Sequence, residues 1–187
     1  MAATRGRSAS AQAHCNSCHR DRNGRCGAGL RLRSGGIAVY PLRSPGPGLL
    51  ETGPSVDARI ATLDRVGVKL VRFTVNWREV ARRKPARAVN PNDPPYDWAR
   101  ADAILKGLRR HRIAVLVTLW GTPRWANRGR GANVVPRNKY SFAAFARAVA
   151  TRYPWIRLWE VWNEPNLRVS LKPNSPALYV HRLLNPT

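Results

Sequence analysis

Glu164 is the residue whose setting most suggests chemistry, because it lies at the end of the apolar segment LWEVWNEPNL. Trp159 and Trp162 precede it, and a carboxyl beside apolar rings is expected to be desolvated, which favours its protonated form. A carboxyl that stays protonated near neutral pH can act as a general acid. Asn163 adds an amide that can hydrogen-bond a substrate hydroxyl, and Pro165 stiffens the turn that presents both side chains.

The elements that would position these residues can be predicted from residue 56 onward. Short apolar, β-branched runs predict buried strands at 68–75, 113–120 and 156–162, with a further short strand at 35–40. Helical spacing of apolar residues predicts helices at 56–67, 96–111, 141–153 and 175–184. Ser55 and Ser141 are the expected N-caps of two of them, Gly67 ends the first, and Pro176 opens the last.

The alternation of these elements predicts the α/β class. Strands that are apolar on both faces and alternate with helices argue for a parallel sheet covered by helices. A doubly wound sheet and a (β/α)8 TIM barrel both fit this order. No glycine-rich nucleotide fingerprint follows a predicted strand, which weakens the doubly wound alternative.

The WNEP sequence at the end of an apolar strand resembles the fourth-strand motif of clan A glycoside hydrolases. These are retaining (β/α)8 enzymes and include the family 5 cellulases and the family 39 xylosidases. The resemblance implies that Glu164 is the acid/base and that Asn163 contacts the sugar 2-hydroxyl. VKLVRFTVNW resembles the clan's second strand, whose arginine lies under the nucleophile, and this implies that role for Arg72. The resemblance extends over residues 51–187.

The segment after the third predicted strand departs from family 5. It reads LWGTPRWAN and has no histidine, whereas family 5 members often have one there. Aromatic residues near strand ends could instead stack on sugar rings, and core packing is the alternative for each of them. These candidate substrate-binding aromatics are Trp77, Trp120, Trp125 and Trp162.

The resemblance implies a second carboxylate that the sequence does not supply. Retaining hydrolysis uses two carboxylates about 5 Å apart, and inverting hydrolysis about 6.5–9.5 Å. The clan's nucleophile is a Glu on the seventh strand, but no Asp or Glu follows Glu164. Glu160 is four residues back on the same strand, about 13 Å away along an extended chain. Glu79 is expected at a helix start or in a loop.

We therefore expect a partial barrel. It would comprise about the first four βα units, the N-terminal half of a fold of typically about 250 residues, without its nucleophile. The exposed sheet edges of such a half-barrel would favour self-association and poor stability as a monomer. A structural alternative for Glu164 is a turn carboxylate that pairs with Arg72 or Arg124, since a buried arginine needs a partner.

Charge is the most unusual feature of the composition. The chain has 33 Lys+Arg against 10 Asp+Glu, a net charge of +23, and only five of the basic residues are lysines. Such a balance can indicate a nucleic-acid or polyanion partner, or an arginine-rich codon bias. Because the arginines are scattered, the codon bias is favoured and nucleic acid is not expected as a partner. Arg124, Arg128 and Arg130 are either a solvated loop or a grip on acidic sugars such as uronates.

The N-terminal segment differs from the rest of the chain. Residues 1–35 have no aromatic and few large aliphatic residues, so we expect a disordered leader, with an out-of-frame or misplaced start as its origin. Residues 36–55 form a Pro/Gly-rich connector around the short first strand. CNSCH, residues 15–19, matches a haem-attachment pattern, and Cys26 with His14 adds a zinc alternative. Neither is favoured, and we expect no cofactor and no metal.

The sequence thus favours a glycoside hydrolase domain at residues 56–187, acting on the O-glycosyl bonds of an oligo- or polysaccharide. A non-catalytic carbohydrate- or polyanion-binding protein is the alternative, and an arginine-rich nucleic-acid binder is a third. No run of 18 apolar residues predicts a membrane-spanning helix. No secretory signal is visible, although intact relatives are expected to be secreted, so localisation stays open.

Overall fold

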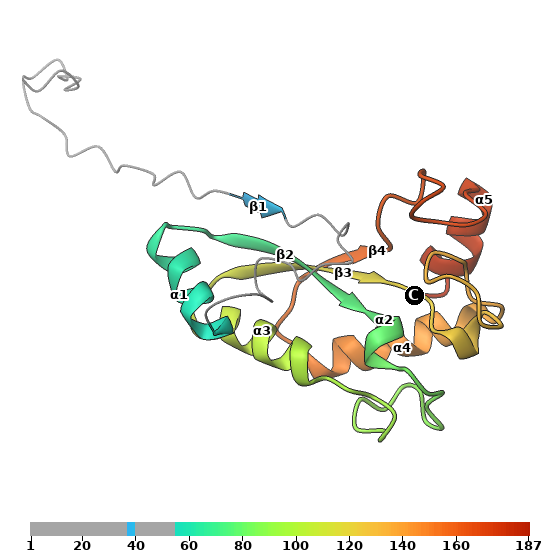
Figure 1. Ribbon diagram of the computed structural model, residues 1–187, viewed down its shortest axis with the longest axis horizontal. Coiled ribbons are helices and arrows are strands. Elements are labelled where there is room, and N and C mark those ends of the chain that lie inside the picture. The colour runs from blue at the N-terminus through green and yellow to red at the C-terminus, as the bar shows by residue number, and fades with distance from the viewer. Residues whose placement is uncertain (1–36, 40–54) are drawn as a thin grey trace, which may run out of the picture. The chain divides into compact units, whose positions relative to one another are not determined.

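The computed structural model describes residues 37–39 and 55–187, which include one four-stranded parallel sheet (Figure 1). Each strand pairs with its neighbour in sequence, in the order β1-β2-β3-β4. The strands are β1 (Ile37–Val39), β2 (Leu70–Asn76), β3 (Ala114–Trp120) and β4 (Leu158–Val161). The predicted strands and the α/β class are confirmed. The expected leader, its cysteine and histidine pattern, and most of the connector lie outside the described residues.

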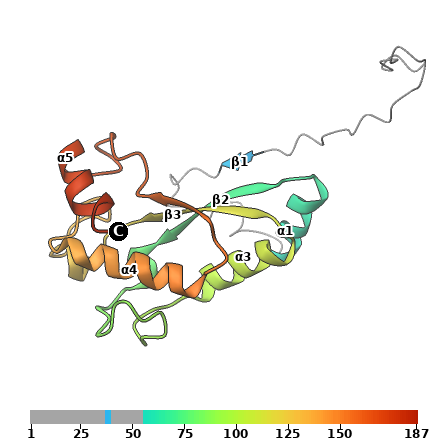
Figure 2. The same cartoon turned by 180° about the vertical axis from the view of Figure 1, so that it is seen from behind.

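Three helices connect successive strands. They are α1 (Val56–Arg65), α3 (Ala99–Arg110) and α4 (Lys139–Arg152). Figures 1 and 2 show all three on the same side of the sheet. A doubly wound sheet has helices on both faces, so the described residues do not show that alternative. No helix among them is long and apolar enough to cross a membrane.

Shorter elements follow the carboxyl ends of the strands. α2 (Trp77–Val80) begins directly after β2, and a 3₁₀ turn (Arg124–Ala126) follows β3. After β4 come α5 (Pro176–Tyr179) and a π-helical turn (Val180–Leu184). α2 was not predicted, because a single turn is too short to show helical periodicity.

Helix ends follow local capping chemistry, with one correction. The Ser55 side chain accepts a hydrogen bond from the Ala58 amide, as an N-cap should, and Gly67 takes a left-handed φ of 83° after α1. The prediction that Ser141 caps the fourth helix is wrong. α4 begins one turn earlier because Asn138 provides the same chemistry, its side-chain oxygen accepting from the Tyr140 amide.

The core lies between the sheet and the three helices. Alternate residues of β2, among them Val71, Phe73 and Val75, are buried on the helix side. Near the carboxyl ends of the strands this core becomes aromatic. Trp77 and Phe145 stack with ring centroids 5.5 Å apart, and Phe142 joins them. The other set of alternate residues in β2 is half-buried, and none of α1, α3 or α4 covers that face, so it is the face available for polar chemistry.

Asp102 joins α3 to α4. The Arg152 guanidinium donates to both Asp102 carboxylate oxygens at 2.9 and 2.5 Å, and the Tyr153 hydroxyl donates to one of them at 2.8 Å. Lys106 adds an ion pair at 3.0 Å from within α3. Burial alone would raise the pKa of Asp102, but the hydrogen bonds from Arg152, Lys106 and Tyr153 outweigh it and lower the pKa from 3.8 to about 2.

Replacing Asp102 with Asn should lower the free energy of unfolding by about 2 kcal/mol at pH 7. The folded-state pKa is depressed, so the carboxylate stabilises the fold fully above about pH 4 and loses this effect as pH falls through about 2. Urea unfolding of both proteins across this pH range measures the difference. As a matched control, Asp57→Asn removes the exposed pair with Arg110 and should cost well under about 1 kcal/mol. Equal losses for the two variants would contradict the assignment.

Candidate active site

An arginine on β2 and a glutamate on β4 form the centre of the polar sheet face. The Arg72 guanidinium donates from Nε and Nη2 to the same Glu160 oxygen, at 2.8 and 2.6 Å. Thr118 lies on β3 between them, in register with Glu160, and its hydroxyl donates to that oxygen at 2.5 Å. Because three donors converge on one oxygen, Glu160 is held as a carboxylate acceptor inside the sheet face.

Asn163 extends this network beyond the end of β4. Arg72 Nη2 donates to Asn163 Oδ1 at 2.5 Å, which fixes the orientation of the amide. The amide nitrogen then donates to Glu164 Oε2 at 3.3 Å. Asn163 is 5% exposed, so these bonds are largely shielded from water. A continuous chain of hydrogen bonds therefore runs from Glu160 through Arg72 and Asn163 to Glu164.

The structure corrects two expectations about Glu164. Its side chain is exposed, so the predicted desolvation by neighbouring rings is absent. It also does not pair with Arg72 or Arg124. Arg72 bonds to Glu160 and Asn163, while Arg124 donates to the Gly129 carbonyl. The sequence did not reveal Glu160 as the partner of Arg72. The available signal was an acid within an apolar strand that was expected to lie in the same parallel sheet as the strand of Arg72.

The turn that presents Glu164 has an unusual backbone. Trp162 has φ of 70° and Glu164 has φ of 39°, both in the left-handed region that non-glycine residues rarely adopt. The turn is held in place by backbone bonds from the Trp162 amide to the Leu119 carbonyl at 2.9 Å and from the Leu167 amide to the Glu164 carbonyl at 2.9 Å. Backbone strain of this kind costs on the order of 1–3 kcal/mol per residue and concentrates at functional sites.

Two of the four predicted aromatic contacts are core residues. Trp77 and Trp162 are 1% and 0% exposed, so neither presents a face to a sugar in this structure. The left-handed turn directs the Trp162 indole inward, where its nitrogen donates to the Ser170 carbonyl at 2.8 Å. Trp120 and Trp125 are half-buried. Trp120 follows Thr118 on the polar face by strand alternation, so its predicted stacking role stays a prediction, as does that of Trp125.

Tyr179 of α5 is a site neighbour that the sequence did not suggest. Its hydroxyl donates to the Val161 carbonyl at 3.0 Å, which ties α5 to the end of β4. Burial raises the pKa of Tyr179, and the negative charge of Glu160 raises it further. Tyr179 therefore stays a neutral hydrogen-bond donor beside the carboxylate.

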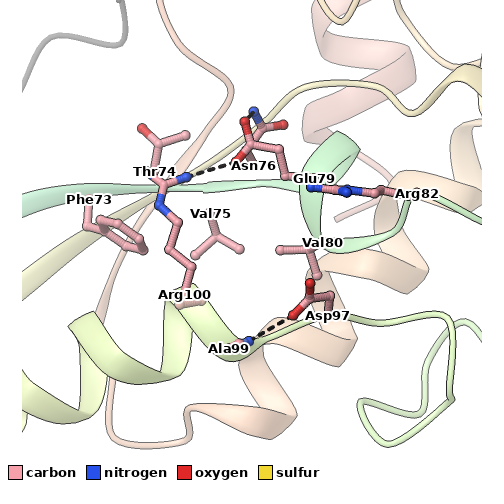
Figure 3. A pocket seen from close by; sticks show the side chains of 11 residues that line it. Phe73, Thr74, Val75, Asn76, Glu79, Val80, Arg82, Asp97, Ala99 and Arg100 are labelled. Carbon is pink, nitrogen blue, oxygen red and sulfur yellow. Dashed lines mark hydrogen bonds and ion pairs between the residues drawn. The ribbon is translucent and has the colours of Figure 1, made fainter. Parts of the chain in front are cut away.

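A separate cavity is lined by the second half of β2, by α2 and by the start of α3 (Figure 3). Its volume of about 180 Å³ is below the 300–1,000 Å³ of typical ligand pockets. Glu79 on its rim bonds to Asn76 at 2.9 Å and pairs with Arg100 at 2.8 Å. Glu79, which was expected at a helix start or in a loop, lies in the first turn of α2.

The described residues offer no metal site. No group of three or more His, Cys, Asp or Glu side chains that could hold an ion occurs among residues 37–39 and 55–187.

Two solved structures that resemble the chain are both family 39 glycoside hydrolases. One is the GH39 enzyme from Xanthomonas axonopodis pv. citri, at 23% identity and a TM-score of 0.46 over 66% of this chain. The other is a family 39 glycoside hydrolase from the gut symbiont Bacteroides cellulosilyticus WH2, at 17% identity and a TM-score of 0.42 over 59% of this chain. The chain covers only 27% and 22% of their lengths. Similarity at this level assigns neither a family nor an activity.

No protein-family model and no curated protein matches the chain. Family 39 is one of the two families that the sequence resemblance suggested, and neither neighbour comes from family 5.

The Arg72–Glu160 pair can be tested by a double-mutant cycle with Arg72→Met and Glu160→Gln. Arg72 is 12% exposed and Glu160 is 36% exposed, so solvent screens the pair in part and a coupling energy of about 1–2 kcal/mol is expected. Chemical denaturation of the four proteins gives this value. The exposed Glu79–Arg100 pair is the matched control and should give less than about 0.5 kcal/mol. Additive effects at Arg72 and Glu160 would contradict the central role of their pair.

Proposed function

We propose that this chain carries the acid/base half of a glycoside hydrolase site, built on the first four βα units of a (β/α)8 barrel. The observation that supports it most is the chain of hydrogen bonds from Glu160 through Arg72 and Asn163 to an exposed Glu164. A parallel sheet with helices on one side and polar residues on the other face has the layout of a barrel wall. In such a fold, working residues lie at the carboxyl ends of the strands, where Glu164 is found.

Glu164 protonates the oxygen of the glycosidic bond as that bond breaks. Asn163 orients it through the bond between the amide nitrogen and Glu164 Oε2. An amide nitrogen carries two hydrogens, so the second is left for a sugar hydroxyl. Arg72 makes this possible by occupying the amide oxygen, which prevents the side chain from flipping. Trp120, half-buried on the same face, supplies a surface for a sugar ring.

The second carboxylate of the mechanism comes from outside the described strands. Glu160 lies on the same strand that ends before Glu164, and one of its oxygens is the acceptor for Arg72 and Thr118, so we assign it the role of partner to Arg72. Glu79 is engaged by Arg100 and Asn76. Within the described residues, β4 pairs only with β3, so its outer edge is where further βα units, or a second copy of the chain, would add.

The role of Glu164 can be tested with azide as an external nucleophile. Azide attacks the anomeric carbon, the glycosidic C–O bond breaks, and the leaving oxygen needs a proton only when it is a poor leaving group. With azide present, Glu164→Gln should lower cleavage of an unactivated disaccharide, whose leaving oxygen needs a proton, by about 100-fold or more. Release of 4-nitrophenolate from a 4-nitrophenyl glycoside needs no proton and should stay nearly unchanged. Chromatography of the products measures both rates.

Glu79→Gln is the matched control, since it removes a carboxylate in α2, after the carboxyl end of β2, and should change neither rate. Equal losses in the two variants would refute the acid/base role of Glu164. Absence of any cleavage by the unmodified chain, with or without azide, would refute catalysis and leave carbohydrate binding as the function.

A further inference from the structure

Four arginines gather in the loops that follow β2 and β3, and we call them the rim arginines: Arg78, Arg124, Arg128 and Arg130. Arg78 donates to the carbonyls of Thr122 and Arg130, at 3.3 and 3.1 Å, so the α2 arginine lies against the β3 loop. The Arg124 guanidinium donates to the Gly129 carbonyl at 3.5 Å, and the Gly129 amide donates to the Arg124 carbonyl at 2.7 Å. These contacts hold Arg78 against the loop at residues 122–130, which carries the other three arginines.

Backbone geometry fixes the loop that carries them. Gly121 begins it with φ of 90°, and a Cβ there would collide with the Asn76 side chain. Arg128 and Gly129 are both left-handed, with φ of 58° and 76°, which makes a tight turn. Arg124, Arg128 and Arg130 are exposed, and Arg78 is half-buried. The loop therefore presents three guanidinium groups to solvent from a defined backbone.

No carboxylate compensates this charge within the described residues. None of the rim arginines forms an ion pair in residues 37–39 and 55–187, and the side-chain bonds of Arg78 and Arg124 go to backbone carbonyls. From residue 103 onward the sequence contains only two acids, Glu160 and Glu164, and Glu160 is bonded to Arg72. Burial lowers the pKa of Arg78, and the nearby positive charge of Arg124 lowers it further. Arg78 and Arg124 thus lie near each other, and neither has an ion-pair partner within the described residues.

The rim arginines lie at the same edge of the sheet as Glu164. The loops after β3 and β4 are joined by bonds from Asn133 to the Val169 carbonyl at 3.0 Å and from the Lys172 amide to the Asn133 carbonyl at 2.7 Å. The rings of Trp120 and Trp162, at the ends of the two strands, lie 5.9 Å apart. The loop that carries Arg124, Arg128 and Arg130 therefore lies beside the loop that begins at Glu164.

We propose that the rim arginines bind the oxyanion substituents of an acidic glycan, a carboxylate or a sulfate carried on the sugar ring. A guanidinium matches such oxyanions with two parallel N–H donors. The proposal rests on the proposed function of Glu164, and it adds the substrate class. A nucleic acid is a poorer fit, because its phosphates would also lie against Glu164, whereas a sugar can hold its charged substituent away from the bond that is cut.

The test is binding of a tetragalacturonate, measured by calorimetry at a fixed salt concentration. The variant R124Q/R128Q/R130Q should weaken binding by about tenfold or more, since it removes the charge-assisted hydrogen bonds to the ligand's oxyanions. Arg78 is kept, because its bonds to two carbonyls support the loop. The control R65Q/R112Q/R157Q removes the same charge from three exposed arginines that precede β2, β3 and β4, at the opposite edge. It should change the affinity by less than about twofold.

Further ligands separate the possible outcomes. The methyl-esterified tetramer should bind weakly, and a sulfated galactan tetramer shows whether sulfate replaces carboxylate. Equal losses in the two triple variants, no binding of either acidic glycan, or tighter binding of an oligothymidylate of equal charge would each overturn the proposal. Glu164→Gln should keep tetragalacturonate binding. Loss of cleavage by this variant therefore tests the acid/base role, and loss of binding in R124Q/R128Q/R130Q tests the rim arginines.

Discussion

The Arg72 guanidinium is the interaction on which the rest of the candidate site depends. It bonds to Glu160 within the sheet and to Asn163 beyond it, and so connects a strand to the turn that follows that strand. Without a donor for the amide oxygen, Asn163 would be free to rotate and could not orient Glu164. Without Glu160, a guanidinium that is mostly buried would be left without a counter-charge. Arg72 thus pairs with Glu160 and, through Asn163, sets the geometry of the exposed Glu164 carboxyl.

The two faces of the sheet have different roles: one packs against the helices and the other carries the polar residues of the candidate site. On one face, β2 and β3 bury aliphatic side chains against α1, α3 and α4, and the aromatic cluster around Trp77 and Phe145 closes the core at the carboxyl end. On the other face β2, β3 and β4 carry Arg72, Thr118 and Glu160 respectively. Because adjacent residues of a strand point in opposite directions, each strand can serve both purposes. The stable helical side holds the strands in register, and that register brings the polar residues together.

The sequence predicted the strands, because runs such as IAVLVTLW are apolar and β-branched throughout. It also predicted most helices. The predicted N-cap of α4 was wrong, because Asn138 and Ser141 are both favourable N-cap residues and the local sequence does not choose between them. The partner of Arg72 depends on how β2 lies relative to β4, which no local pattern encodes. The sequence left sugar stacking and core packing open for Trp162, and its burial depends on its own left-handed φ after β4, which no local pattern predicts. Residues placed by tertiary register or by unusual backbone angles were therefore the ones that the sequence could not locate.

The bond between Arg72 and Glu160 joins residues 88 positions apart, and it passes over β3 to connect β2 with β4. Neighbouring strands can pair after one crossover has formed, but this bond needs two crossovers and three strands in place. The entropy of closing so long a loop is offset only once the strands between are already paired. The site therefore assembles late, after the sheet that supports it. A chain that has formed only part of its sheet carries no oriented Glu164, which makes the reactive geometry itself a marker of completed folding.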